Sequence, residues 1–218
     1  MPHQLLEEVF NKAGLPILFD KEKKEKFCIY LKELQKWNKR INLTSIKNDT
    51  EIIEKLFLDS VFLIKFFNIE PVSDCLDIGS GAGFPGIPVR IITNGLNLFL
   101  LEATKKKVSF LKHISRVLSL EKTYVISKRL EEISNDEKYF EKFGLIITRA
   151  VSLSPKLIMN SYKLLSKNGV LIYFGGEDPL KNSILEKLVP VQLQHTFSRL
   201  TAHEDRLQKR HANTETEG

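Results

Sequence analysis

Three glycines at alternate positions follow an apolar segment, and this arrangement is typical of a turn that holds a nucleotide. Gly79, Gly81 and Gly83 come directly after the apolar segment 72–78. Glycine is needed where the backbone has a positive φ or lies against a ligand, because a Cβ atom would collide there. A glycine-rich turn between a strand and a helix is the usual nucleotide-binding corner of an α/β sheet. The glycines therefore predict a cofactor site, but NAD, FAD and S-adenosylmethionine (SAM) all use such a turn.

The charge of Asp77 favours SAM among these cofactors. Asp77 stands two residues before Gly79. A dinucleotide would bring an anionic pyrophosphate to this corner, and a carboxylate would repel it. SAM carries an ammonium and a sulfonium group instead, and a carboxylate would attract both. We therefore predict that Asp77 and the three glycines bind SAM.

Charged residues also follow the later apolar segments, where the carboxyl ends of parallel strands would meet. Glu102 ends the second segment, and a carboxylate at this place can accept hydrogen bonds from ribose hydroxyls. Leu130 and Glu131 follow the third segment and are candidates for contact with adenine, although a helix start with acids that match its dipole is equally compatible. Arg149 ends the fourth segment and is predicted to face the site, because burying an arginine without a partner is costly.

Signatures of several other chemistries are missing from the sequence. The segment 149–155 lacks the Asn/Asp-Pro-Pro-aromatic pattern used to methylate exocyclic amines, and neither Cys28 nor Cys75 is placed as a nucleophile for a pyrimidine carbon. No spacing of histidine and cysteine predicts a metal site. An acceptor atom with a free lone pair, such as guanine N7, remains. It carries no proton, so no general base is required and catalysis is mainly positioning for in-line attack on the methyl group.

The elements expected around these residues form an α/β fold. Residues 1–70 have apolar side chains at helical spacing and predict a small helical N-terminal region. In residues 71–200 short apolar strands alternate with helices, which predicts a Rossmann-like, mostly parallel twisted sheet with helices on both faces. The polar segment 201–218 is predicted to be disordered. The predicted strands are 72–78, 97–102, 123–127, 144–148, 169–174 and an edge strand at 191–200. The predicted helices of this domain are 86–93, 104–119, 129–134, 154–166 and 178–188.

Composition and charge fit a globular protein with an anionic partner. Of its 218 residues, 42% are hydrophobic and 28% are charged. No apolar run is long enough for a bilayer, the N-terminus does not resemble a secretory signal, and two cysteines suit a reducing compartment. The net charge of +6 permits a nucleic-acid partner, provided that local clusters supply the surface. A cytoplasmic monomer without membrane attachment is expected.

Longer stretches of the chain resemble the RsmG (GidB) family, bacterial small-subunit (16S) ribosomal RNA methyltransferases that modify a guanine at N7. The resemblance implies a SAM-dependent rRNA (guanine-N7)-methyltransferase that acts on this RNA or on the assembling small ribosomal subunit. The matching stretches are Lys36–Thr44, Leu58–Ser60, Asp77–Pro88, Leu100–Ala103, Lys107–Leu111 and Thr148–Ala150. The SAM contacts that the resemblance implies are Gly79, Phe84, Leu130, Glu131 and Arg149.

Basic and polar residues in two regions are candidates for contact with the RNA. Lys105, Lys112 and Arg116 share one face of the helix predicted at 104–119, and either a phosphate-binding stripe or a solubilising face is compatible with them. The remaining candidates lie in the first matching stretch, and they are Lys39, Asn42 and Thr44. Trp37 of the same stretch belongs to an apolar stripe, which favours a place in the core over stacking on a base.

Three places differ from the family pattern. Leu56 stands where the family usually has a histidine, and Gly175 follows the fifth strand where the family tends to have a lysine. Residues 206–218 lack the hydrophobic final strand of the family fold. The first two differences leave an alternative open, in which the chain keeps the SAM-type fold and RNA affinity with weakened or lost transferase activity.

Overall fold

Five parallel strands form one sheet in the computed structural model, which describes residues 2–15, 20–65, 67–69, 74–93, 95–149 and 151–174. The strand order is β3-β2-β1-β4-β5, and each neighbouring pair is parallel. The prediction of a mostly parallel sheet with helices is therefore confirmed. The strands are β1 (Asp74–Ile78), β2 (Asn97–Leu101), β3 (Thr123–Ile126), β4 (Phe143–Arg149) and β5 (Leu165–Phe174).

Side chains of the central strands alternate between two hydrophobic cores, one on each face of the sheet. On β1, Cys75 belongs to the larger core, whereas Leu76 and Ile78 belong to the smaller one. On β4, Leu145 and Ile146 divide in the same way. Successive residues of a strand point to opposite faces, so a strand covered on both sides becomes a continuous apolar run. This burial explains why these strands could be predicted from apolar segments alone.

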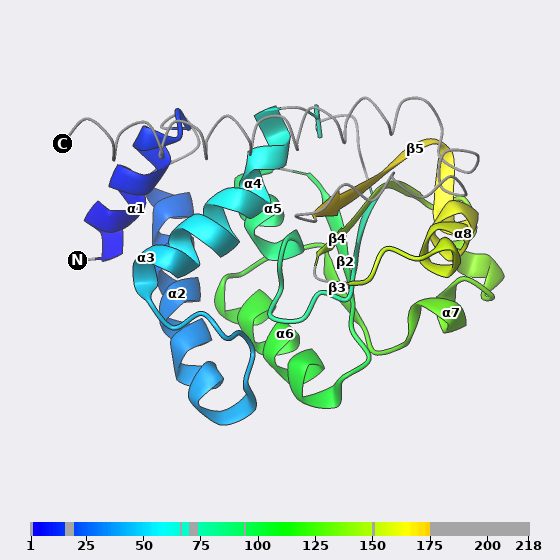
Figure 1. Cartoon of the computed structure of the whole chain (residues 1–218), viewed down its shortest axis with the longest axis horizontal. Coiled ribbons are helices and arrows are strands. Elements are labelled where there is room, and N and C mark those ends of the chain that lie inside the picture. The colour runs from blue at the N-terminus through cyan, green and yellow to red at the C-terminus, as the bar shows by residue number, and fades with distance from the viewer. Residues whose placement is uncertain are drawn as a thin grey trace, which may run out of the picture.

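The helices fall into an N-terminal group and a group that connects the strands (Figure 1). In the N-terminal group, the carboxylate of Asp20 caps the long helix α2 by accepting from the Lys23 amide, at 2.8 Å. The N-terminal group consists of α1 (Pro2–Lys12), α2 (Lys21–Ile41), α3 (Asp49–Ile52), the π-helix η2 (Ile53–Leu58), α4 (Asp59–Phe62) and the 3₁₀ turn η3 (Leu63–Lys65). The connecting group consists of α5 (Gly86–Ile92), α6 (Lys105–Val117), α7 (Leu130–Ile133), the 3₁₀ turn η4 (Glu137–Tyr139) and α8 (Pro155–Leu164).

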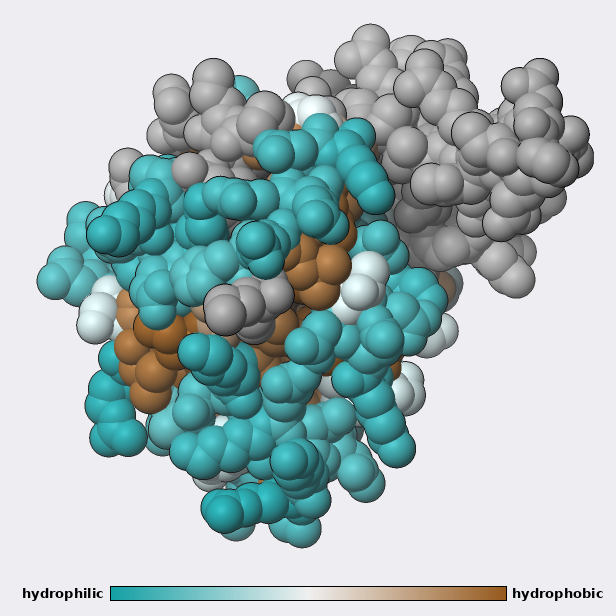
Figure 2. Space-filling model, turned by 90° about the vertical axis from the view of Figure 1, so that its left-hand side faces the viewer, coloured by the Kyte–Doolittle hydropathy of each residue, from teal (hydrophilic) through white to brown (hydrophobic). Residues whose placement is uncertain are grey.

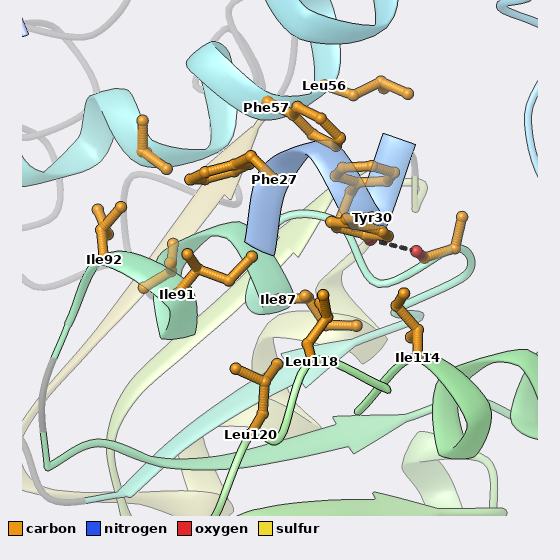
Figure 3. Close-up of a cluster of buried hydrophobic side chains, with 14 of the residues drawn as sticks. Phe27, Tyr30, Leu56, Phe57, Ile87, Ile91, Ile92, Ile114, Leu118 and Leu120 are labelled. Atoms are coloured by element: carbon orange, nitrogen blue, oxygen red, sulfur yellow. Dashed lines mark hydrogen bonds between the residues drawn. The ribbon is translucent and has the colours of Figure 1, made fainter. Parts of the chain in front are cut away.

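The N-terminal helices and the sheet share the larger core. Phe27 and Leu34 of α2 belong to the same cluster of buried side chains as Leu98 of β2 and Leu145 of β4. Figure 3 shows side chains of this cluster converging from the N-terminal helices, α5 and the end of α6. The outer face of the N-terminal helices is mostly hydrophilic, with smaller hydrophobic patches between the polar residues (Figure 2). The helical region is therefore an integral layer of the fold.

Several predicted features lie outside the described residues. These are Gly175, the helix predicted at 178–188, the edge strand at 191–200 and the tail at 201–218. None of the helices in the described ranges is both long and apolar enough to span a bilayer.

Candidate active site

The glycine turn has the backbone conformation that its residues predict. Gly79, Gly81 and Gly83 have φ values of 70°, 57° and 93°, which L-residues with a side chain rarely adopt. A Cβ atom on Gly79 would also lie only 2.7 Å from Cγ2 of Val151. The turn therefore needs glycine both for its conformation and for the space around it.

Hydrogen bonds fasten this turn to the end of β2. The amides of Gly79 and Ser80 both donate to the Leu101 carbonyl, at 2.9 and 3.1 Å. The carboxylate of Glu102 then accepts from the Gly81 amide at 3.0 Å and from the Thr104 amide at 2.8 Å. Glu102 is only 8% exposed, but its two oxygens can accept about four hydrogen bonds in all, so it keeps acceptor capacity for a ligand.

Asp77 is the penultimate residue of β1, is fully buried, and connects the strand to the start of α5. Its Oδ2 accepts from the Gly86 amide, at 3.1 Å, at the start of α5. Its Oδ1 is buried without a hydrogen-bond partner among the described residues. Burial raises the pKa of this carboxyl to about 7, against the opposing effect of the Gly86 hydrogen bond. Asp77 does not belong to the lining of the adjacent cleft, so its direct contact with a cofactor stays a prediction.

An open cleft of about 300 Å³ lies at the carboxyl ends of the strands, where ligands bind in open α/β sheets. Four of the predicted cofactor residues line it, namely Gly79, Glu102, Leu130 and Glu131. The other five lie outside its lining, namely Asp77, Gly81, Gly83, Phe84 and Arg149. The remaining lining residues are Ile78, Leu101, Ala103, Lys128, Arg129, Val151, Ser152, Ser154, Lys156, Leu157 and Asn160.

Sequence reasoning missed the part of this cleft that the start of α8 provides. Ser154 caps α8 by accepting from the Leu157 amide, and Lys156 pairs with Glu131 at 2.8 Å across the cleft. That pairing with Lys156 lowers the pKa of Glu131. The rule that ligands sit beyond the strand ends could have indicated this segment, because it follows β4 directly. Among the described residues, no group of three histidine, cysteine or acidic residues is placed to hold a metal ion.

Arg149 ends β4, but its guanidinium is directed to the N-terminal helices. Nη1 lies 2.8 Å from Oδ2 of Asp59, and Nη2 donates to the Lys55 carbonyl at 2.6 Å. Burial raises the pKa of Asp59, whereas Arg149 lowers it. The partner could not be found from the sequence, although Asp59 lies in the family-like stretch Leu58–Ser60. Leu56, in the π-helix, is buried in the core rather than in the cleft lining.

The candidates for RNA contact lie on α2, on the loop after it and on α6. Lys39, Lys105, Lys112 and Arg116 are exposed, and the buried Val108 and Leu111 of α6 confirm the expected division of that helix into two faces. Trp37 of α2 packs against α6. The centroid of its ring lies 5.5 Å from that of Phe110 and 5.0 Å from that of His113. The basic residues therefore lie on two helices that pack together.

The loop after α2 is organised by one amide side chain. Oδ1 of Asn38 accepts from the Leu43 and Thr44 amides at 2.6 and 3.0 Å, and Nδ2 donates to the Thr44 carbonyl at 2.9 Å. Asn42 ends the helix in a left-handed conformation, with φ of 41°, and is exposed. The matching stretch thus holds Asn42 and Thr44 in a fixed loop, which is a structural role that spacing alone did not indicate.

Two solved structures with a similar fold are named as putative methyltransferases. A putative O-methyltransferase from Klebsiella pneumoniae matches with a TM-score of 0.53 at 12% identity, covering 80% of this chain and 76% of that one. A putative caffeoyl-CoA O-methyltransferase from Staphylococcus aureus matches with a TM-score of 0.50 at 14% identity, covering 86% and 89%. At these identities the likeness shows the fold alone.

Sequence relatives are much closer. The ribosomal RNA small subunit methyltransferase G of Syntrophus aciditrophicus is 38% identical over 165 residues, which are 75% of this chain and 68% of that protein. The proteins of the same name from Dictyoglomus thermophilum and Caldanaerobacter subterraneus are 37% and 40% identical, over 64% and 72% of their lengths. The matches thus span roughly two thirds of these relatives. A family model described as rRNA small subunit methyltransferase G (GidB) matches residues 23–211, and the chain belongs to this family.

Proposed function

We propose that this chain transfers a methyl group from SAM to N7 of a guanine in small-subunit (16S) ribosomal RNA. Membership of the rRNA small subunit methyltransferase G family supports methyl transfer to this RNA over binding without transfer. The observation that carries the proposal is the cleft at the strand ends, where Gly79 and Glu102 meet Leu130. A ribosomal RNA substrate would place the reaction in the cytoplasm, and we expect a monomer to perform it.

The residues around the cleft fit SAM. Glu102 keeps acceptor capacity for ribose hydroxyls beyond the two amides that it already holds. Leu130 offers a partly buried apolar side chain for the adenine ring, and Gly79 lets a ligand approach the backbone. The Oδ1 of Asp77 has no hydrogen-bond partner among the described residues, and in its ionised form this buried carboxyl favours a cationic ligand over an anionic one.

Catalysis by this chain is mainly positioning. When bound, SAM supplies an electrophilic methyl carbon on a positively charged sulfur, to which a lone pair on N7 can bond as the carbon–sulfur bond breaks. N7 carries no proton, so the chain does not need a general base, and no histidine lines the described cleft. Arg149 has a positioning role in this proposal. Through Asp59 and the Lys55 carbonyl it ties the end of β4 to the N-terminal helices.

The exposed basic residues of α2 and α6 would hold the phosphates of the RNA. Lys39 lies on α2, while Lys105, Lys112 and Arg116 lie on the outer face of α6. The net charge of +6 agrees with an anionic partner. Asn42 and Thr44 would contact the RNA from a loop that Asn38 already fixes, so little ordering would be needed on binding. The partner is the 16S RNA or the assembling small subunit.

Mapping of the methylated nucleotide tests the proposal. The full chain is incubated with SAM and either protein-free 16S RNA or small ribosomal subunits that lack the modification, and the RNA is digested for mass spectrometry. We expect one 7-methylguanosine, and at a SAM concentration near the wild-type dissociation constant we expect far less of it with Glu102→Gln but not with the matched surface variant Tyr162→Phe. SAM binding without a methylated nucleotide on either substrate would refute transfer and restore the binding-only alternative.

A further inference from the structure

A buried tyrosine of the N-terminal region contacts the backbone of the glycine turn. Tyr30 lies in the middle of α2 and has no exposed surface. Its hydroxyl donates to the Ala82 carbonyl at 2.5 Å, across 52 residues of sequence (Figure 3). A Cβ atom on Gly83 would lie 2.7 Å from the same hydroxyl oxygen. The hydroxyl therefore rests directly against the turn, at two consecutive residues.

The ring of Tyr30 is held in place by two phenylalanines. It stacks on Phe84, the last residue of the turn before Pro85, with ring centroids 5.3 Å apart and planes at 13°. It also stacks on Phe57 of the π-helix η2, at 5.1 Å, and Phe57 lies 5.8 Å from Phe84. The three rings form a triangle that joins α2, η2 and the turn. Aromatic pairs at these distances stabilise beyond their buried area.

We propose that Tyr30 is a positioning residue that fixes the cofactor turn from its inner side, as Glu102 fixes it from the cleft side. The inference rests on the proposed SAM site. Three glycines with positive φ give this turn more backbone freedom than other residues would. A ligand that had to order such a turn would lose affinity, whereas a turn that is already fixed avoids this cost.

The surroundings keep the hydroxyl available as a donor. Burial, with a smaller effect of the Asp77 charge, raises the pKa of Tyr30 well above its ordinary value. The phenol is thus protonated throughout the range in which the protein would work. If the hydroxyl is removed, the Ala82 carbonyl loses this hydrogen bond, and a buried acceptor left unsatisfied is costly.

Tyr30→Phe tests the proposal, because it keeps the ring and removes only the hydroxyl. We expect the dissociation constant for SAM, measured by calorimetry on the full chain, to rise about tenfold, while the rate at saturating SAM stays within about twofold. In the free protein, the amides of residues 79–84 and of Gly86 should exchange hydrogen faster. The matched control is Val9→Ala, a buried truncation on α1 in the same helical region. It should lower overall stability but leave the dissociation constant for SAM unchanged, and residues 79–86 should not exchange faster relative to the rest of the core.

The outcomes separate this inference from the proposed function. If Tyr30→Phe binds SAM with the wild-type dissociation constant and its turn exchanges at the wild-type rate, the role of Tyr30 is overturned. The proposed function would still stand. A wild-type chain that binds no SAM would overturn the function, whereas the exchange data would still test the link between Tyr30 and the turn. If Tyr30→Phe does not fold, Phe57→Leu loosens the ring from the helix side. Wild-type affinity and exchange in that variant would contradict the proposal.

Discussion

The buried carboxyl of Asp77 should make the stability of this protein fall as the pH rises from about 4 to about 7. Burial raises its pKa to about 7, compared with 3.8 for the exposed group. Between these two values the folded chain holds a proton that the unfolded chain has released. The stabilisation is therefore complete below the unfolded pKa and is lost as the pH rises through the folded pKa. A difference of about three pKa units corresponds to about 4 kcal/mol.

Asp77→Asn isolates this effect. The asparagine has nearly the same shape, and its side-chain oxygen can still accept from the Gly86 amide. Because the amide does not titrate, the variant should gain stability relative to the wild type steadily across this pH range and then level off above about pH 7. Urea unfolding at half-unit pH steps, followed by circular dichroism, measures the difference. Parallel pH profiles for the two proteins would refute the reasoning.

Three further predictions concern the cleft and the RNA surface. Glu102→Gln should weaken SAM binding by about ten- to a hundredfold, because an amide has one acceptor oxygen for two backbone donors; unchanged calorimetric affinity would contradict this. Asp59→Asn should cost less than about 1 kcal/mol of stability, since the pair with Arg149 is partly exposed, yet slow methylation several-fold. A double-mutant cycle with Arg149→Lys should then give non-additive rates. Removing both Lys105 and Lys112 should reduce the slope of log affinity for RNA against log salt concentration by about 1.5 to 2. If the variant and the wild type have the same slope, this face of α6 does not bind phosphates and only keeps the protein soluble.

Most of the sheet could be predicted because its strands are short apolar runs next to glycines and polar turns. The prediction is least accurate for β5, which begins at Leu165 instead of residue 169. Its first half carries polar residues, and it joins the sheet through pairing of Leu165 with Phe143, before an irregular register. That pairing is a tertiary contact, so the local pattern did not contain it. The π-helical turns at Ile53–Leu58 were likewise missed, because apolar spacing there fits an ordinary helix.

In the candidate site, too, some residues could be predicted from the local sequence, whereas others depend on tertiary contacts. Glu102 and Gly79 could be placed at the cleft from their position after strands, because topology alone brings strand ends together. The partners of Arg149 and of the Ala82 carbonyl could not be predicted. Asp59 and Tyr30 come from helices that are far away in the sequence. Tyr30 lies at helical spacing with the apolar residues of α2. A phenol at such a position must bring its hydroxyl to an acceptor, and that requirement was the available signal.

The core that the N-terminal helices share with the sheet has a consequence for how the chain can be divided. Phe27, Phe57 and Leu98 belong to one continuous apolar cluster, so neither part can be removed without exposing the other's interior. The helical region is thus not an independent module that could be grafted or deleted at will. Folding should be a single cooperative transition, with helix and sheet signals melting together. A change at a helix residue that contacts the turn, such as Tyr30, should therefore be felt in both parts of the chain.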